Sequence, residues 1–185
     1  MNSSDSERIF HALEMFRLEI PSWGFANTGT RFGKFLQPAA ASTTREKFCD
    51  AAQVQRVTGV CPTIALHVLW DFPQGIDSTK EIADLSTRHG IQPGSINRIF
   101  FKTRFTSTVL SATRMLRSDQ HALQHTKNSI EIARRLHSRD ISMWFADGSS
   151  YPGTANIRRH KLWFEETLKE VHAQLSSEQR LLVEI

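Results

Sequence analysis

Four side chains that could take part in catalysis or binding lie within or at the ends of extended apolar runs in this chain of 185 residues. Trp23 ends the first run, the second contains His67, the fourth contains Trp144, and Glu184 ends the fifth. An imidazole or a carboxylate can transfer protons or ligate a metal. Indole rings form flat apolar walls, which suit the C–H faces of a sugar. These residue types favour a pocket in which His67 and Glu184 handle protons or a metal.

Each of these residues also has an ordinary structural interpretation. A single histidine in a strand is more often a hydrogen-bonded core residue than a catalyst, and tryptophans such as Trp23 and Trp144 are mostly buried anyway. Glu184 stands one residue from the end of the chain, where an isolated acid is usually a solvated charge. Spacing alone therefore leaves both interpretations open.

The elements that must position these side chains alternate between short β-type runs and amphipathic helical stretches. Capping boxes at Thr43–Glu46 and Ser78–Glu81 predict two helix starts. The predicted strands are FRLEIPSWG (16–24), CPTIALHVLWDFP (61–73), IQPGSIN (91–97), DISMWFADGSSYPG (140–153) and RLLVE (180–184). This order predicts an α/β fold whose parallel strands are joined by right-handed crossovers.

Two parallel architectures fit such an alternation, a doubly wound sheet and a (β/α)₈ barrel. Gly24, Gly29 and Gly33 follow the first strand without the GxGxxG spacing that binds a pyrophosphate, so the barrel is preferred. A complete barrel has eight strands and about 250 residues. Residues 1–185 are therefore expected to form a single incomplete TIM-barrel domain, about the first four and a half βα units. In such a sheet the functional residues lie at the carboxyl ends of the strands.

Composition narrows the class of protein further. The chain is 39% hydrophobic and 23% charged, which is typical of a globular domain, and Cys49 and Cys61 are its only cysteines. No apolar run is long enough to cross a membrane, and the first residues do not resemble a secretory signal, so a cytoplasmic location is expected. The net charge of +4 comes from one segment. Residues 98–118 contain five basic and no acidic side chains, which leaves 18 basic and 19 acidic side chains elsewhere. No nucleic-acid partner is expected.

Several long strings resemble one enzyme family. IPSWGFANTGTRFGKF, TGVCPTIALHVLWDFP, SIEIARRLHSRDISMWFADGSSYPGTANIRR and the final LLVE are similar to L-rhamnose isomerases, in the xylose-isomerase-like group of TIM barrels. The resemblance covers almost the whole chain except residues 98–119. It implies that His67 lies near the ring oxygen of the sugar and assists ring opening, and that Trp23 and Trp144 form walls of the pocket. It also implies that Glu184 is a ligand of a divalent metal pair (Mn²⁺, Co²⁺ or Mg²⁺), and that the intact protein is a homo-oligomer.

Such isomerases interconvert aldoses and ketoses by moving hydrogen between C1 and C2, with metal ions holding the sugar oxygens. Glu184 is the one metal ligand that the resemblance assigns to this chain, so the chain by itself is expected to be an inactive fragment. Two alternatives remain open. One is another xylose-isomerase-like barrel enzyme, an epimerase or an endonuclease-IV-like protein. The other is a non-enzymatic vestigial or binding protein with a basic arm, which salt-dependent binding of nucleic acid would reveal.

The segment 98–119 departs from the family pattern. After Ile96-Asn97 relatives continue with a motif close to INPNxFQDQxYKxGSxxNPD, whereas this chain continues RIFFKTRFTSTVLSATRMLR. Codons can be chosen so that the neighbouring frame encodes the missing motif, and a similar single-base change accounts for the ending Glu184-Ile185. The hypothesis is a frameshift in the gene. It is wrong if the nucleotide sequence gives neither the motif nor further strands in the other frame.

We predict that residues 98–118 are poorly ordered or non-specifically helical, because bulky apolar and basic residues alternate there without a sustained period of 2 or 3.6. Hydrogen exchange measures this directly. Amide protection as strong as in residues 62–70 would show that the segment is a regular structural element.

Overall fold

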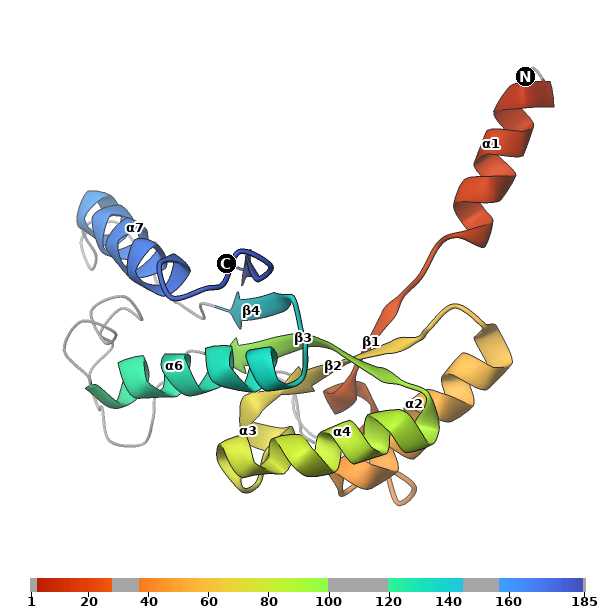
Figure 1. Cartoon of the computed structure of the whole chain (residues 1–185), viewed down its shortest axis with the longest axis horizontal. Coiled ribbons are helices and arrows are strands. Elements are labelled where there is room, and N and C mark those ends of the chain that lie inside the picture. Colours follow the sequence, from red (N-terminus) through yellow and green to blue (C-terminus); the bar gives the residue numbers. More distant parts are fainter. Residues whose placement is uncertain (1–2, 28–36, 100–119, 145–156, 185) are drawn as a thin grey trace.

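The computed structural model describes residues 3–27, 37–99, 120–144 and 157–184, and its centre is a parallel sheet (Figure 1). The sheet has five strands, all parallel, in the order β1-β2-β3-β4-β5. They are β1 (Glu19–Pro21), β2 (Thr63–His67), β3 (Gln92–Ile99), β4 (Asp140–Trp144) and β5 (Arg180–Glu184). Each strand pairs with the next one in the chain. This sequential order is that of a barrel, because a doubly wound sheet reverses its strand order.

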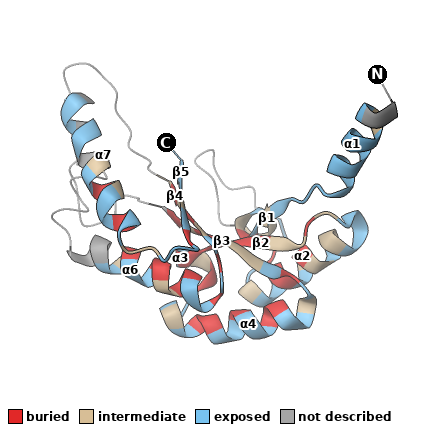
Figure 2. Cartoon of the chain, turned by 45° about the horizontal axis from the view of Figure 1, so that its top comes forward, coloured by how far each residue is buried: buried red, intermediate tan, exposed pale blue. Residues whose placement is uncertain are grey.

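Helices connect successive strands and cover one face of the sheet. They are α2 (Thr44–Thr58), α3 (Val68–Asp71), α4 (Ser78–His89), α6 (Gln120–Arg135) and α7 (Ile157–His172), with 3₁₀ turns η1 (Ser22–Phe25) and η2 (Gly75–Asp77). Figure 2 shows α2, α4 and α6 on the same side of the strands, whereas α1 (Ser3–Glu14) stands away from the body. None of the helices in the described ranges combines the length and apolar character needed to cross a bilayer.

The two predicted capping boxes have different outcomes. Thr43 caps α2 by accepting from the Glu46 backbone N–H, while the Glu46 carboxylate accepts from the Thr43 backbone N–H. Hydrogen bonds from Ser42 and Thr43 lower the pKa of Glu46. The box expected at Ser78 is wrong, because Asp77 occupies the N-cap of α4 and makes no side-chain cap.

The core lies between the sheet and this helical layer. Side chains of alternate strand residues point toward the helices, among them Ile64 and Leu66 of β2 and Ile141 and Met143 of β4, each at most 1% exposed. They pack in one cluster with Phe48 of α2 and with residues of the other helices. Burial of this apolar face holds the strands in register. The alternate residues, including His67, point to the opposite face.

Two of the predicted strands are shorter than the sequence suggested. The run 61–73 divides at His67 into β2 and the one-turn helix α3, because the His67 side chain accepts from the Leu69 backbone N–H and caps that helix. The run 16–24 forms strand only at β1 and then turns into η1. Pro21 ends it because proline has no N–H to continue the ladder.

Strand β3 is longer than predicted. Arg98 and Ile99, the first two residues of the segment expected to be irregular, pair with Met143 and Trp144 of β4. The Arg98 side chain is buried and donates a hydrogen bond to the Thr126 hydroxyl on α6. Burial lowers the pKa of Arg98 to about 10. The rest of that segment lies outside the described residues, as do residues 28–36 and 145–156.

Gly94 of β3 lies against a side chain that comes from β1. The Glu19 carboxylate of β1 reaches over β2 to β3, where it accepts from the Ser95 backbone N–H at 2.9 Å and from the Ser95 hydroxyl at 2.5 Å. A Cβ atom at Gly94 would overlap this carboxylate. The absent side chain at position 94 therefore makes room for a polar link across three strands.

Substituting Gly94→Ala should lower the free energy of unfolding by about 1–3 kcal/mol, because the Glu19 carboxylate must move aside and lose its two bonds to Ser95. Urea denaturation measures the loss. Gly24→Ala is the matched control, because a Cβ atom there meets only the Pro21 Cγ atom at an ordinary 3.6 Å. Equal losses in the two variants would contradict the steric argument.

Candidate functional site

The carboxyl edge of the sheet gathers the predicted site residues on one face. His67 pairs with Asn97 and Asn97 with Ser142, whereas Trp144 pairs with Glu184. Residues in register on parallel strands point to the same face, and positions two apart on a strand do as well. His67, Trp144 and Glu184 therefore share the face opposite the helices. Strands lie about 4.8 Å apart, so Glu184 is three strands, about 14 Å, across the sheet from His67.

Three aromatic rings cluster at this edge beside the first two strands, β1 and β2. The Trp70 ring stacks on the His67 imidazole, with centroids 3.8 Å apart and planes at 21°. The Trp23 ring meets both edge-on, at 6.0 Å from His67 and 6.3 Å from Trp70. Trp23 comes from η1, His67 from the end of β2 and Trp70 from α3. The turns that shortened the predicted strands thus bring these rings together.

His67 has a defined tautomer and a defined charge. Its Nδ1 atom accepts from the Leu69 backbone N–H at 3.2 Å, so in the neutral ring the proton is on Nε2. The side chain is buried, and among the described residues Nε2 has no hydrogen-bond partner. Burial lowers the pKa of His67 to about 4; Asp71 opposes this, while Lys47 and His125 add to it. The imidazole is therefore neutral at pH 7.

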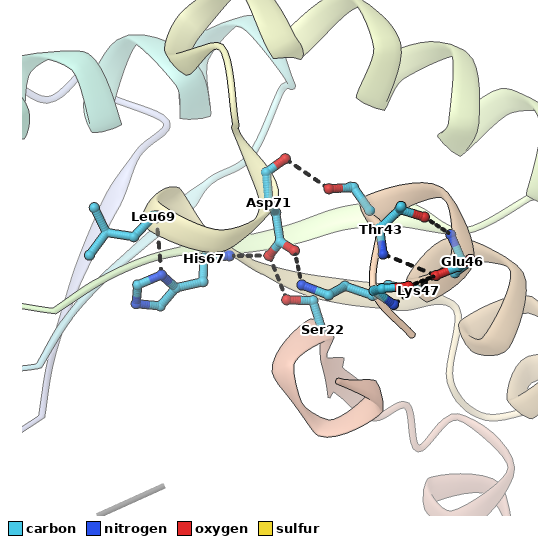
Figure 3. A network of polar contacts seen from close by, with 9 residues as sticks. Ser22, Thr43, Glu46, Lys47, His67, Leu69 and Asp71 are labelled. Carbon is cyan, nitrogen blue, oxygen red and sulfur yellow. Dashed lines mark hydrogen bonds and ion pairs between the residues drawn. The ribbon is translucent and has the colours of Figure 1, made fainter. Parts of the chain in front are cut away.

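Beneath the aromatic cluster lies a fully buried ion pair (Figure 3). Lys47 of α2 places its Nζ 2.6 Å from Oδ1 of Asp71, the last residue of α3. The other Asp71 oxygen, Oδ2, accepts from the Ser22 hydroxyl at 2.5 Å and from the His67 backbone N–H at 2.7 Å. We call Ser22, Lys47 and Asp71 the carboxylate node. The node therefore links η1, α2 and the turn after β2.

The structure separates the four sequence-predicted residues into two pairs. Trp23 and His67 are in contact, although Trp23 lies in a 3₁₀ turn and not at a strand end. Trp144 and Glu184 are register partners on β4 and β5. Glu184 is exposed, and no group of three His, Cys, Asp or Glu side chains that could hold a metal ion occurs in the described ranges. These residues do not by themselves fit a divalent-metal site.

Two further candidate residues, Lys47 and His125, are not recognisable from the sequence. Lys47 sits within a helix among charged residues, and nothing in its spacing shows that it is buried beside Asp71. His125 of α6, to which the sequence analysis assigns no role, is half-buried. Its Nδ1 atom is buried, and burial together with the Arg98 charge lowers its pKa. The close spacing of Trp70 and Asp71 to His67 was the one signal available for the network.

Comparison with known proteins places the chain beside sugar isomerases over part of their length. It is 28% identical over 189 residues to a probable sugar isomerase of Rhizobium meliloti (strain 1021). The alignment includes 97% of this chain and 42% of that protein. The chain thus spans about two fifths of the relative's length. No protein-family model matches the chain. These findings show partial-length homology to probable sugar isomerases.

Solved structures confirm the expected fold. The chain superposes on the IOLI protein, crystallised with a zinc atom, and on a D-allulose 3-epimerase from Methylomonas sp.. Each comparison has a TM-score of 0.56 at 11% identity and includes 91% of this chain and 51% of the other. At such identity the likeness shows the fold alone. The chain covers about half of each of these structures, and its five parallel strands agree with the incomplete TIM barrel that the sequence predicted.

The lowered pKa of His67 predicts a loss of stability in acid. A histidine whose pKa falls on folding contributes stability above its unfolded value, near 6.5, and loses that contribution as pH falls toward the folded value of about 4. Between pH 7 and pH 4.5 the loss from this residue should be about 2 kcal/mol. Urea denaturation of the protein and of His67→Asn at both pH values isolates it, because asparagine keeps an acceptor for the Leu69 N–H.

The variant should lose less stability over this interval than the unmodified chain. The charged groups that act on His67, namely Asp71, Lys47 and His125, are the same in both proteins, so their contributions largely cancel in the comparison. An identical loss in the two proteins would show that His67 does not titrate in this interval.

Proposed function

We propose that this chain supplies the sugar-binding and ring-opening side of an aldose–ketose isomerase site, with L-rhamnose or a related aldose as substrate. The observation that carries the proposal is the buried His67 Nε2–H, which has no partner among the described residues and belongs to a ring that stacks on Trp70 and meets Trp23 edge-on. Partial-length homology to probable sugar isomerases supports it. A protein of the same fold, the D-allulose 3-epimerase, has been crystallised with D-allulose.

The geometry suits His67 to one step. Opening a sugar ring breaks the bond between C1 and the ring oxygen, and the proton that the anomeric hydroxyl loses ends on the ring oxygen. The neutral His67 carries a hydrogen on Nε2, so it can donate a hydrogen bond to the ring oxygen as negative charge develops there and before that proton arrives. Trp23 and Trp70 offer apolar faces to the C–H groups of the sugar. Trp144 extends this wall from β4, two strands away.

The hydrogen transfer between C1 and C2 needs groups that the described residues do not provide. In the proposal Glu184 would be one ligand of a divalent ion, Mn²⁺, Co²⁺ or Mg²⁺, at the carboxyl edge of β5. A hard divalent ion takes about six ligands. The complete reaction therefore belongs to a protein that contains the remaining ligands, which we propose is a homo-oligomeric isomerase.

The 185-residue chain alone should show no EDTA-sensitive conversion of L-rhamnose or related aldoses to ketoses. One carboxylate cannot hold the ions that orient the sugar hydroxyls. Ketose formation is measured with purified chain, added Mn²⁺ and an EDTA control. Robust EDTA-sensitive turnover would overturn this prediction and require a site that the described residues do not reveal.

In a full-length protein that contains this chain, His67→Ala should lower isomerase turnover roughly 10²- to 10⁴-fold, the usual range for loss of a general acid–base group. Glu184→Gln should chiefly weaken metal binding, measured by calorimetric titration with Mn²⁺. His172→Ala, on an exposed part of α7, is the control and should change neither quantity. Unchanged turnover in His67→Ala would remove the basis of the proposed role.

The substrate assay also separates the alternatives. An epimerase would convert one ketose into another and leave aldoses unchanged. A basic binding protein would bind nucleic acid with a steep dependence on salt and would not respond to sugars. Either result would replace the isomerase proposal.

A further inference from the structure

The carboxylate node joins the parts of the chain that carry the aromatic cluster. Ser22 directly precedes Trp23, and Asp71 directly follows Trp70. The Asp71 carboxylate also accepts from the backbone N–H of His67. The Asp71 carboxylate is therefore bonded to the residue before Trp23 and to His67 itself, while Asp71 is the residue after Trp70.

Backbone pairing between β1 and β2 does not extend to Trp23, so it does not fix this ring relative to the other two. Strand β1 ends at Pro21, so Trp23 lies beyond the last residue paired with β2. The N-cap of η1, Pro21, makes no side-chain cap hydrogen bond. The far end of the turn is held by a bond from the Ala41 N–H to the Phe25 carbonyl at 2.8 Å. At the near end, the Ser22 hydroxyl donates to Asp71 at 2.5 Å.

From this arrangement we propose that Asp71, held by Lys47, is a positioning residue that sets the place of Trp23 against His67 and Trp70 through Ser22. The carboxylate accepts three bonds of 2.5 to 2.7 Å from donors on three different elements. The meaning of this placement for catalysis rests on the proposed function. The placement itself is a property of the chain without sugar.

The chemistry of the node favours positioning over simple stabilisation. Burying an ion pair removes two charges from water, and apolar residues of similar volume often stabilise a fold equally well or better. An apolar pair cannot, however, accept directed bonds from a hydroxyl and a backbone N–H at once. Lys47 pairs with one oxygen of Asp71, and the other oxygen accepts from the Ser22 hydroxyl and the His67 N–H.

The test uses the 185-residue chain labelled with 5-fluorotryptophan and observed by ¹⁹F NMR without ligand. The chain has four tryptophans, so four resonances are expected, and single Trp→Phe variants assign them. Ser22→Ala removes one hydroxyl from the node and leaves the Lys47–Asp71 pair intact. We expect the Trp23 resonance to shift or broaden while the Trp144 resonance keeps its position.

The matched control is Ser138→Ala. The Ser138 hydroxyl is also buried and also makes a 2.5 Å bond, to the Gly94 carbonyl, at the amino-terminal side of β4. Its removal should lower the unfolding midpoint by a similar amount and leave the Trp23 resonance unchanged. A Trp23 resonance that stays fixed in Ser22→Ala, or that moves equally in Ser138→Ala, overturns the proposal.

A second variant guards against an uninformative result. Asp71→Asn keeps the shape of the side chain but removes the charge that Lys47 faces, and it should move the Trp23 and Trp70 resonances together. If this variant does not fold, Ser22→Ala still decides the question. Titration of the labelled chain with L-rhamnose is a separate readout. If no resonance responds to the sugar, the proposed function loses its support, whereas the Trp23 comparison still decides the positioning role.

Discussion

The carboxyl ends of parallel strands must lie at one edge of their sheet, and the candidate site depends on this constraint. Residues far apart in the chain, such as His67 and Glu184, reach the same face because every strand of the sheet runs in the same direction. The helices between the strands cover the opposite face, where burial of the apolar core supplies most of the stability. Polar and aromatic groups can then be placed at the edge without disturbing that core.

Pairing between strands fixes the positions only of residues that belong to strands. The closest ring contacts of the candidate site, however, involve residues that lie beyond the strand ends. Trp23 and Trp70 lie in short turns, η1 and α3, which have few backbone hydrogen bonds of their own. The Asp71 carboxylate provides directed bonds at this point and is balanced by Lys47. The fold thus uses two kinds of interaction: non-directional burial for the layers, and one buried charge with directed bonds for the turns.

The same division explains how much the sequence could predict. Periodicity and turn residues predict the five strands and the barrel-like order, because apolar alternation and glycine positions depend on local physical rules. Strand ends were less predictable. The apolar run through residues 61–73 gives no sign that His67 caps a new helix with its own side chain. The Lys47–Asp71 contact joins residues 24 positions apart and depends on how α2 packs, which no local pattern encodes.

Arg98 shows how a strand can accept a residue that the core does not favour. Backbone pairing with β4 continues through Ile99 irrespective of side-chain type, so β3 keeps its register. The side chain of Arg98 then enters the helix-facing layer beside apolar residues such as Ile96, and its pKa falls because burial disfavours its charge. Lys47, the other buried lysine or arginine in the described ranges, faces a carboxylate, whereas Arg98 donates to a neutral hydroxyl. Backbone pairing in a strand can therefore continue through a residue whose charge is disfavoured by burial in the layer that its side chain enters.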